Sequence, residues 1–414
     1  MLFLYNLGIR LYTAFIQTAS LKSSKAKAWI NGRRGILHKI KSEIDQGKTH
    51  IWFHFASLGE FEQGRSVLEQ FRKLEPETRL VITFFSPSGY EIRKNTPLAD
   101  HVFYLPVDTQ RNAAEFIRLI NPTMAIFTKY EYWFHYFNEL KRNQIPLYIV
   151  SGIFRKTQSF FRWYGGLHRK MLGCVSYFFV QNEESRNLLK GLNFENVVVS
   201  GDTRFDRVFE NAQNPKQLQA IGDFCGDAQI FVAGSTWLAD ENLLSALPAR
   251  FPGWKFIVAP HEIDEKRIIE IEAAFSESMR LSNLQPSTLN FQILIIDNIG
   301  MLSSIYQYGD LAFIGGGFGA GIHNTLEAAA FGLPVIFGPR YQKFKEAVDL
   351  IELEAAFPVG DLNKLTGIAE KLKNEPFRLE CGKKAKEYVR KNTGATKMII
   401  NYITTENRLS PRQL

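Results

Sequence analysis

Short apolar runs alternate with longer amphipathic stretches from residue 50 onward. The runs are rich in Val, Ile and Phe and show no clean polar alternation, which is typical of parallel strands covered on both faces. The intervals between them are long enough for a covering helix. The predicted strands lie in HIWFHFAS, RLVITFF, MAIFT, PLYIV, YFFVQ and VVVS in the first half, and in QIFVAGS, KFIVAP, FQILIID, DLAFIGG and PVIFG in the second.

A polar stretch without a strand pattern, residues 210–227, separates the two sets of runs. We therefore expect an α/β chain with two doubly wound, Rossmann-like domains that face each other across a cleft. A length of 414 residues also suits two domains. The predicted parts are an N-terminal segment at 1–48, a first domain at 49–209, a linker at 210–227 and a second domain at 228–414, with loose order expected at 391–414.

The first 21 residues, MLFLYNLGIRLYTAFIQTASL, form an apolar stretch about long enough to span a bilayer. Arg10 near its centre would cost about 2.5–3.5 kcal/mol there. With the lysines that follow, the pattern favours a helix lying in an anionic membrane surface, and a buried first helix is the alternative. Polar residues spaced by three and four form one stripe of this helix: Asn6, Arg10, Thr13, Gln17 and Ser20.

Charge and cysteine content refine this picture. The net charge of +8 suggests a nucleic-acid partner, but residues 1–48 hold nine Lys/Arg and only two Asp/Glu. The rest of the chain has 41 basic and 40 acidic residues, so its body is neutral and nucleic acid is not expected to bind. Cys174, Cys225 and Cys381 are few and far apart, as in a reducing compartment, and the basic flank places the body on the cytoplasmic side.

A glycine-rich turn, GGGFGAGIHNTLE at residues 315–327, follows a predicted strand and opens a helix. Its glycines allow backbone amides to approach a ligand closely, and the helix terminus attracts anions. Asn324 and Glu327 stand three residues apart, which also suits a helix cap. The carboxylate of Glu327 can accept hydrogen bonds from a ribose diol, so a nucleotide is the expected ligand alongside the capping alternative.

The first half has a matching candidate in FHFASLGEFEQG at residues 53–64. Ser57 and Glu60 fit the S-x-x-E pattern of a capping box, so a purely structural role is one interpretation. Glu60 also follows the carboxyl end of a strand, where open α/β sheets carry their chemistry. A carboxylate that faces a cleft at that point can take a proton from an attacking hydroxyl.

These motifs occur in a fixed order: SLGE at 57–60, YEYW at 130–133, GDTRFD at 201–206, GST at 234–236, DNIGML at 297–302 and GIHNTLEAAAFGLPVIFGP at 321–339. In this order and spacing they resemble the 3-deoxy-D-manno-octulosonic acid (Kdo) transferases of Gram-negative lipopolysaccharide synthesis. The resemblance implies the GT-B glycosyltransferase fold and transfer of Kdo from CMP-Kdo to a lipid A precursor. It also implies a place at the cytoplasmic face of the inner membrane, with no cofactor and no protein-bound metal.

The resemblance implies roles for individual positions. Glu60 matches the family's general base, while Glu131 and Arg204 match two positions that stabilise the transition state. The positions that match the CMP-Kdo site are Pro260, His261, Ile299, Gly300, Met301, Asn324, Thr325, Leu326 and Glu327.

Four positions depart from the family pattern. Lys129 stands where the family usually has a second acid, and Arg204 stands where it usually has a lysine. APHE at 259–262 lacks the arginine of the family's Pro-Arg-His stretch, and SGIFR at 151–155 moves an arginine to Arg155. Each departure changes the charge or the reach of the expected site.

Two other functions fit the residues. One is another GT-B sugar-nucleotide enzyme, either a UDP- or GDP-sugar transferase or an epimerase, which a preference for cytidine nucleotides would exclude. The other is a non-catalytic, membrane-bound carbohydrate-binding protein, for which substitution of Glu60 would leave function intact.

Overall fold

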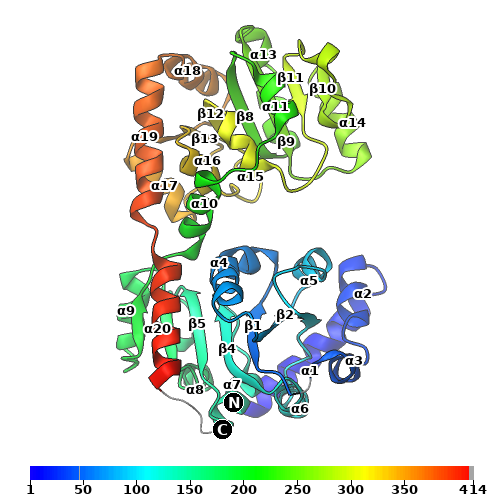
Figure 1. Cartoon of the computed structure of the whole chain (residues 1–414), viewed down its shortest axis with the longest axis vertical. Helices are drawn as coiled ribbons and strands as arrows, with labels where there is room; N and C mark the ends of the chain where they lie inside the picture. The colour runs from blue at the N-terminus through cyan, green and yellow to red at the C-terminus, as the bar shows by residue number, and fades with distance from the viewer. Residues whose placement is uncertain (46, 410–414) are drawn as a thin grey trace. The chain divides into compact units, whose positions relative to one another are not determined.

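A computed structural model describes residues 1–45 and 47–409 of the chain. Contacts divide the chain into two compact units, each built on its own sheet (Figure 1). The first unit comprises Met1–Asp206 and the chain from Gly394 onward, and the second comprises Arg207–Thr393.

The first unit is built on seven parallel strands in the order β3-β2-β1-β4-β5-β6-β7. These strands are β1 (His50–Phe55), β2 (Arg79–Phe84), β3 (His101–Tyr104), β4 (Pro122–Thr128), β5 (Leu147–Gly152), β6 (Tyr177–Val180) and β7 (Val197–Val199). The helices between them are α4 (Leu58–Leu74), α5 (Pro87–Arg93), α6 (Gln110–Ile120), α7 (Phe134–Arg142), α8 (Gly166–Leu172) and α9 (Glu183–Lys190).

Three helices precede this sheet: α1 (Leu2–Ala19), α2 (Ser24–Asn31) and α3 (Ile36–Glu43). Helix α1 contains no buried residue, so the alternative of a buried first helix is wrong. Within the described ranges, no helix combines the length and apolar character needed to cross a membrane.

The second unit is also a sheet of seven parallel strands, in the order β10-β11-β9-β8-β12-β13-β14. These strands are β8 (Gln229–Thr236), β9 (Trp254–Pro260), β10 (Ser278–Arg280), β11 (Ile293–Ile295), β12 (Leu311–Ile314), β13 (Val335–Phe337) and β14 (Ala356–Pro358). Its helices include α11 (Gln219–Cys225), α12 (Leu238–Leu244), α13 (Leu247–Arg250), α14 (Glu265–Ala274), α15 (Leu302–Ile305), α16 (Leu326–Phe331), α17 (Lys345–Glu352), α18 (Leu362–Leu372) and α19 (Glu375–Lys391).

The chain leaves the first unit within α10 (Thr203–Gln213) and returns to it in α20 (Ala395–Leu409). Asp206 accepts hydrogen bonds from the main-chain N–H groups of Gly394 and Thr396, and the Thr396 hydroxyl lies 2.9 Å from that of Ser66 on α4. Ile399, Ile400 and Ile403 of α20 are buried in the core. The expectation of a loosely ordered segment after residue 391 is therefore wrong for residues 395–409.

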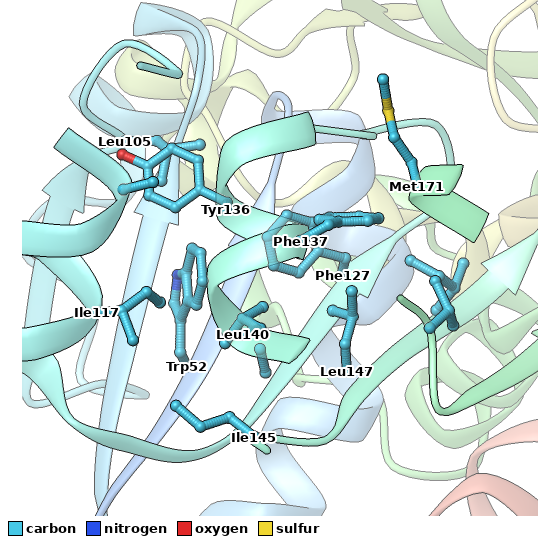
Figure 2. Close-up of a cluster of buried hydrophobic side chains, with 14 of the residues drawn as sticks. Trp52, Leu105, Ile117, Phe127, Tyr136, Phe137, Leu140, Ile145, Leu147 and Met171 are labelled. Atoms are coloured by element: carbon cyan, nitrogen blue, oxygen red, sulfur yellow. The ribbon is translucent and has the colours of Figure 1, made fainter. Parts of the chain in front are cut away.

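The largest core cluster fixes α7 against the middle of the first sheet. Figure 2 shows Trp52 of β1 beside Tyr136 and Leu140 of α7. The Trp52 ring centroid lies 4.9 Å from that of Phe127 on β4 and 5.7 Å from that of Tyr136. This packing holds the start of α7 close to the ends of β1 and β4.

Every strand predicted from the apolar runs is present, which confirms two doubly wound, Rossmann-like units. In the first sheet the strand order reverses between β1 and β4. In the second sheet the corresponding reversal lies between β8 and β12, and β11 lies between β9 and the edge strand β10. Such switch points are where open α/β sheets bind ligands, at the carboxyl ends of the strands.

Candidate active site

Both switch points are flanked by the motifs identified in the sequence. Glu60 follows β1 and Glu131 follows β4, so the two acids border the switch point of the first sheet. Trp237 follows β8 and the turn at residues 315–327 follows β12, at the switch point of the second sheet. The topology therefore assigns one candidate site to each unit.

Glu60 lies in the first turn of α4 and is partly exposed. The side chain of Ser57 makes no capping hydrogen bond to the backbone; instead its hydroxyl donates to the Glu60 carboxylate. The capping-box interpretation is therefore wrong for this pair. Ser57 orients the carboxylate at the start of α4.

Glu131 is held by two donors. Its Oε2 accepts a hydrogen bond from Trp133 Nε1 at 2.8 Å and lies 3.3 Å from Nε2 of His54, whose imidazole is fully buried. His54 Nδ1 lies 2.8 Å from the Thr83 hydroxyl, which accepts from Trp52 Nε1 at 2.7 Å. The Thr83 hydroxyl can donate either to the Phe53 carbonyl oxygen at 3.4 Å or to Nδ1. When it donates to Nδ1, the neutral imidazole carries its proton on Nε2 and donates to Glu131.

Arg204, in the first turn of α10, is oriented by Asp202. Its main-chain N–H and Nε each donate to Asp202 at 2.9 Å, and Nη2 lies 2.8 Å from the same carboxylate. Asp202 is buried and also accepts from Gln63 Nε2 at 2.9 Å. Burial raises the pKa of Asp202, but Arg204 and these bonds more than offset that, so the pKa lies below its usual value. The ionised carboxylate thus fixes the direction of the guanidinium.

Further cationic groups gather around Tyr130. The Arg155 guanidinium lies 6.0 Å and the Lys129 ammonium 5.6 Å from the Tyr130 ring centroid. Burial raises the pKa of the Tyr130 hydroxyl, Arg155 and Arg204 oppose that effect, and Glu60 adds to it. Lys129 also adopts a positive φ of 63°, a strained conformation that is common at functional sites.

The glycines at the second switch point allow backbone segments to touch. A Cβ atom at Gly315 would lie 2.3 Å from the carbonyl oxygen of Ser235, and one at Gly317 would lie 2.6 Å from the Cα atom of Gly338. Gly316 has a φ of +92° and donates its N–H to the buried Asp240 carboxylate at 2.9 Å. The turn is therefore a tightly packed backbone surface.

Asn324 bonds the start of α16, and it also holds the Glu327 carboxylate. Helix α16 has Thr325 as its N-cap, and Asn324 Oδ1 accepts from the N–H of Leu326 at 3.1 Å. Asn324 Nδ2 donates to Glu327 Oε1 at 3.0 Å. The side chains of Thr325 and Leu326 are buried, so a ligand would meet these two positions through the main chain.

Three flat rings stack beside this turn. The His261 ring centroid, just after β9, lies 4.8 Å from that of Trp237 and 4.4 Å from that of His323. Trp237 Nε1 donates to His323 Nε2 at 2.9 Å. Burial and His261 lower the pKa of His323 to about 4, so its imidazole is neutral at physiological pH.

The remaining predicted donor positions lie at the same edge of the second sheet. Pro260 ends β9, and residues 299–301 follow β11, its neighbour. Ile299 is highly exposed, and Gly300 has a φ of +89°. Among residues 1–45 and 47–409, no group of three or more His, Cys, Asp or Glu is arranged to hold a metal ion.

The groups that orient the predicted residues carry no clear signal in the local sequence. Nothing in the local sequence indicates a role for His54, and the GDTRFD motif indicated Arg204 but no role for Asp202. Trp237 follows GST directly, yet nothing in its spacing indicates the stack with His261 and His323. Each of these roles depends on a contact between elements that are distant in the chain.

Comparisons with known proteins agree on one family. A family model described as "3-Deoxy-D-manno-octulosonic-acid transferase (kdotransferase)" matches residues 29–207. The 3-deoxy-D-manno-octulosonic acid transferase of Chlamydophila psittaci is 30% identical over 318 residues, covering 73% of this chain and 72% of that protein. A bifunctional glycosyltransferase/methyltransferase of Fusobacterium nucleatum is 25% identical over 392 residues, which is 90% of this chain but only 59% of the relative's length.

A solved structure shares the fold at low sequence identity. The UDP-GlcNAc 2-epimerase of Neisseria meningitidis bound to UDP-GlcNAc matches with a TM-score of 0.61 and 14% identity, covering 86% of this chain and 100% of that one. A likeness at this level shows the GT-B fold alone, because one fold serves many reactions.

Proposed function

The chain belongs to the Kdo transferase family, and from that premise we propose that it transfers Kdo from CMP-Kdo to a lipid A precursor of the lipid IVA type, with Glu60 as general base. The observation that carries this proposal is the pair of oriented acids, Glu60 and Glu131, which follow the two strands that flank the first switch point. Open α/β sheets bind their ligands at such switch points. A carboxylate can act as the general base that removes the proton of the acceptor hydroxyl during sugar transfer.

In the proposed reaction, Glu60 takes the proton of an acceptor hydroxyl as its oxygen bonds to the anomeric carbon of Kdo. The bond from that carbon to the CMP phosphate breaks, and CMP leaves with the electron pair. The sugar gains positive charge as this bond opens, and the Glu131 carboxylate is suited to stabilise it. The Arg204 guanidinium, held by Asp202, is suited to the negative charge that develops on the phosphate.

We propose that CMP-Kdo binds to the second unit. The glycine turn at 315–321 offers closely packed backbone at a strand end, which suits a phosphate. The exposed edge of the stacked rings of Trp237, His261 and His323 suits the flat cytosine base. Glu327, held by Asn324, would accept hydrogen bonds from the ribose hydroxyls.

The proposed membrane partner is an anionic lipid surface at the cytoplasmic face of the inner membrane. Apolar side chains of α1 point outward, including Phe3 at 76% and Phe15 at 66% exposure. Exposed Lys22, Lys25 and Lys27 follow the helix. The exposed apolar side chains would enter the acyl region of a membrane, and the lysines next to them would contact the anionic headgroups.

The decisive experiment is incubation with CMP-Kdo and a tetraacylated lipid A precursor, with the products weighed by mass spectrometry. A mass increase of the acceptor by Kdo units is expected. Titration with CMP, UDP and GDP tests the rival sugar-nucleotide enzymes, because the proposal requires preference for cytidine. Absence of transfer together with tighter UDP or GDP binding would contradict the proposal.

The membrane partner is tested separately by deleting residues 1–21. The truncated protein should bind anionic vesicles more weakly and still bind CMP, because the second unit is unchanged. Unchanged vesicle sedimentation by the truncated protein would exclude α1 as the lipid-facing element.

A further inference from the structure

The N-terminus of α7 is capped by other parts of the first unit. The first N–H groups of a helix have no partner within it, and the N-cap residue Trp133 provides no side-chain bond. The N–H of Phe134 donates to the Tyr5 hydroxyl oxygen at 3.2 Å. The N–H groups of His135 and Tyr136 donate to the buried Asp108 carboxylate at 3.1 and 3.2 Å.

Tyr5 comes from α1, so the N-terminal helix completes this cap. The Tyr5 hydroxyl also donates to Asp108, and Asn6 Oδ1 lies 2.7 Å from Nε2 of His135. The side of α1 that meets the protein is thus polar and bonded to the start of α7. Asn6 belongs to the polar stripe predicted for α1, which therefore serves a protein contact at this position.

A second path leads from α1 to Glu131 through aromatic rings. The Tyr12 ring stacks on Phe85 with centroids 6.1 Å apart, and Phe85 lies 4.8 Å from the Trp133 ring. Trp133 donates its Nε1 proton to Glu131. Both paths therefore end on residues 131–135, the segment that carries the Glu131 carboxylate into α7.

Helix α1 buries little of its own surface. It has no fully buried residue, and most of its large apolar side chains are exposed. A segment with little buried apolar surface opens more readily than the core. The seating of α1 is consequently a property that can vary independently of the sheet.

We propose that α1 is a positioning element for the active site: Tyr5, Asn6 and Tyr12 hold residues 131–135 so that the Glu131 carboxylate keeps its orientation. This inference rests on the proposed function, because it assumes that Glu131 acts in the transition state. It gives the two sides of α1 separate tasks, with the outward side facing lipid and the inward side holding the catalytic segment. Removal of the inward contacts should lower turnover without weakening lipid binding.

The test uses the full-length double variant Tyr5→Phe/Asn6→Ala and the single variant Tyr5→Phe, assayed with a detergent-solubilised acceptor. The double variant should lose about ten- to a hundredfold in kcat, the range for small misplacements of a catalytic group. The KM for CMP-Kdo and the binding to anionic vesicles should match the parent. The matched control is Tyr164→Phe, which removes the same hydroxyl from an exposed tyrosine outside both paths and should turn over normally.

Hydrogen exchange gives a readout that does not depend on catalysis. In the double variant the amides of Phe134 and His135 should exchange at least about tenfold faster than in the parent, whereas core amides of β1 should be unchanged. A parental kcat in a well-folded double variant would overturn the inference, with or without faster exchange. If Glu131→Gln alone turned over normally, the proposed role of Glu131 would fail, and the exchange data would still report separately whether α1 holds the segment.

Discussion

At the switch point of the first sheet, Glu60 and Glu131 are each oriented by a neighbouring side chain, with Lys129, Arg155 and Arg204 nearby. At the switch point of the second sheet, the corresponding positions are glycine backbone and the stacked rings of Trp237, His261 and His323. The two sheets share one parallel, doubly wound topology, so the fold itself does not assign these tasks. The residues placed after the strands do.

The charged pair between α12 and α14 in the second unit is internal. Glu241 accepts from the Thr236 hydroxyl at 2.8 Å and pairs with Arg267, and both charged residues are buried. In the first unit Arg204 keeps part of its side chain exposed while Asp202 holds it. This difference is what the proposed function requires, in which the first unit would stabilise charge and transfer a proton and the second would bind the nucleotide.

The largest expected effect that would break this comparison comes from Glu60→Gln. Glutamine retains an oxygen that can accept from Ser57, but it cannot take a proton from the acceptor. Turnover should fall at least about a hundredfold, while CMP affinity and melting temperature stay near the parent's. Glu62→Gln is the control, because Glu62 lies on the same helix and pairs with Arg93 at 2.5 Å. Near-parental turnover of Glu60→Gln would exclude Glu60 as the general base.

Glu327→Gln should affect binding instead of proton transfer. Loss of a charge-assisted hydrogen bond to the ribose should make the binding free energy of CMP less favourable by about 1.5–3 kcal/mol, which calorimetry measures. Glu370→Gln on α18 serves as the control, since its carboxylate pairs with Lys373 at the surface. Unchanged CMP affinity with a lower melting temperature would reduce Glu327 to a local structural role.

Gly317→Ala tests whether the second switch point depends on close backbone packing. The new Cβ would meet Gly338 backbone at 2.6 Å, and overpacking of this kind costs about 1–3 kcal/mol. Gly319→Ala is the matched control in the same turn, because the nearest atom to its Cβ would lie at 3.5 Å. Thermal melting and CMP titration should separate the two variants, and equal behaviour would show that the turn adapts.

The smallest expected effect is a pH dependence of the second unit. The pKa of His323 is about 4 in the folded chain against an ordinary 6.5, so the unfolded chain binds this proton first. The free energy of unfolding should therefore fall as pH decreases from about 6.5 towards 4, with little contribution above that range. The free energy of unfolding, measured by urea titration at each pH, should decrease more steeply towards low pH in the parent than in His323→Gln across this window. If the unfolding free energies of the two proteins changed in parallel with pH, the ring stack would not be lowering the pKa of His323.

The strands that apolar runs did not predict share one property. β3, β10 and β14 all lie at sheet edges, are three or four residues long and are only partly buried. An edge strand has one neighbour and a partly solvated face, so its sequence needs no continuous apolar run. The central strands, buried on both faces, were predicted because their burial demands that run.

Local signals indicated Glu60 and the 315–327 turn, because each follows a predicted strand. Glu131 was predicted only through the family resemblance of the ordered motifs, and the comparisons then identified that family. Ser57 illustrates the limit of such signals. Its spacing from Glu60 indicates a capping box, yet its hydroxyl bonds the carboxylate directly, because the rotamer chosen depends on the surrounding packing.

The sequence by itself determined the two parallel sheets, the amphipathic first helix, and the acids and glycines at the strand ends, because periodicity and strand-end position are properties of neighbouring residues. Only the tertiary structure decided which groups orient those acids. His54 is separated from Glu131 by 77 positions, and Tyr5 from Phe134 by 129. Hydrogen bonds over such distances exist only after the sheet has brought its strand ends together, and no local pattern encodes which side chains will meet there.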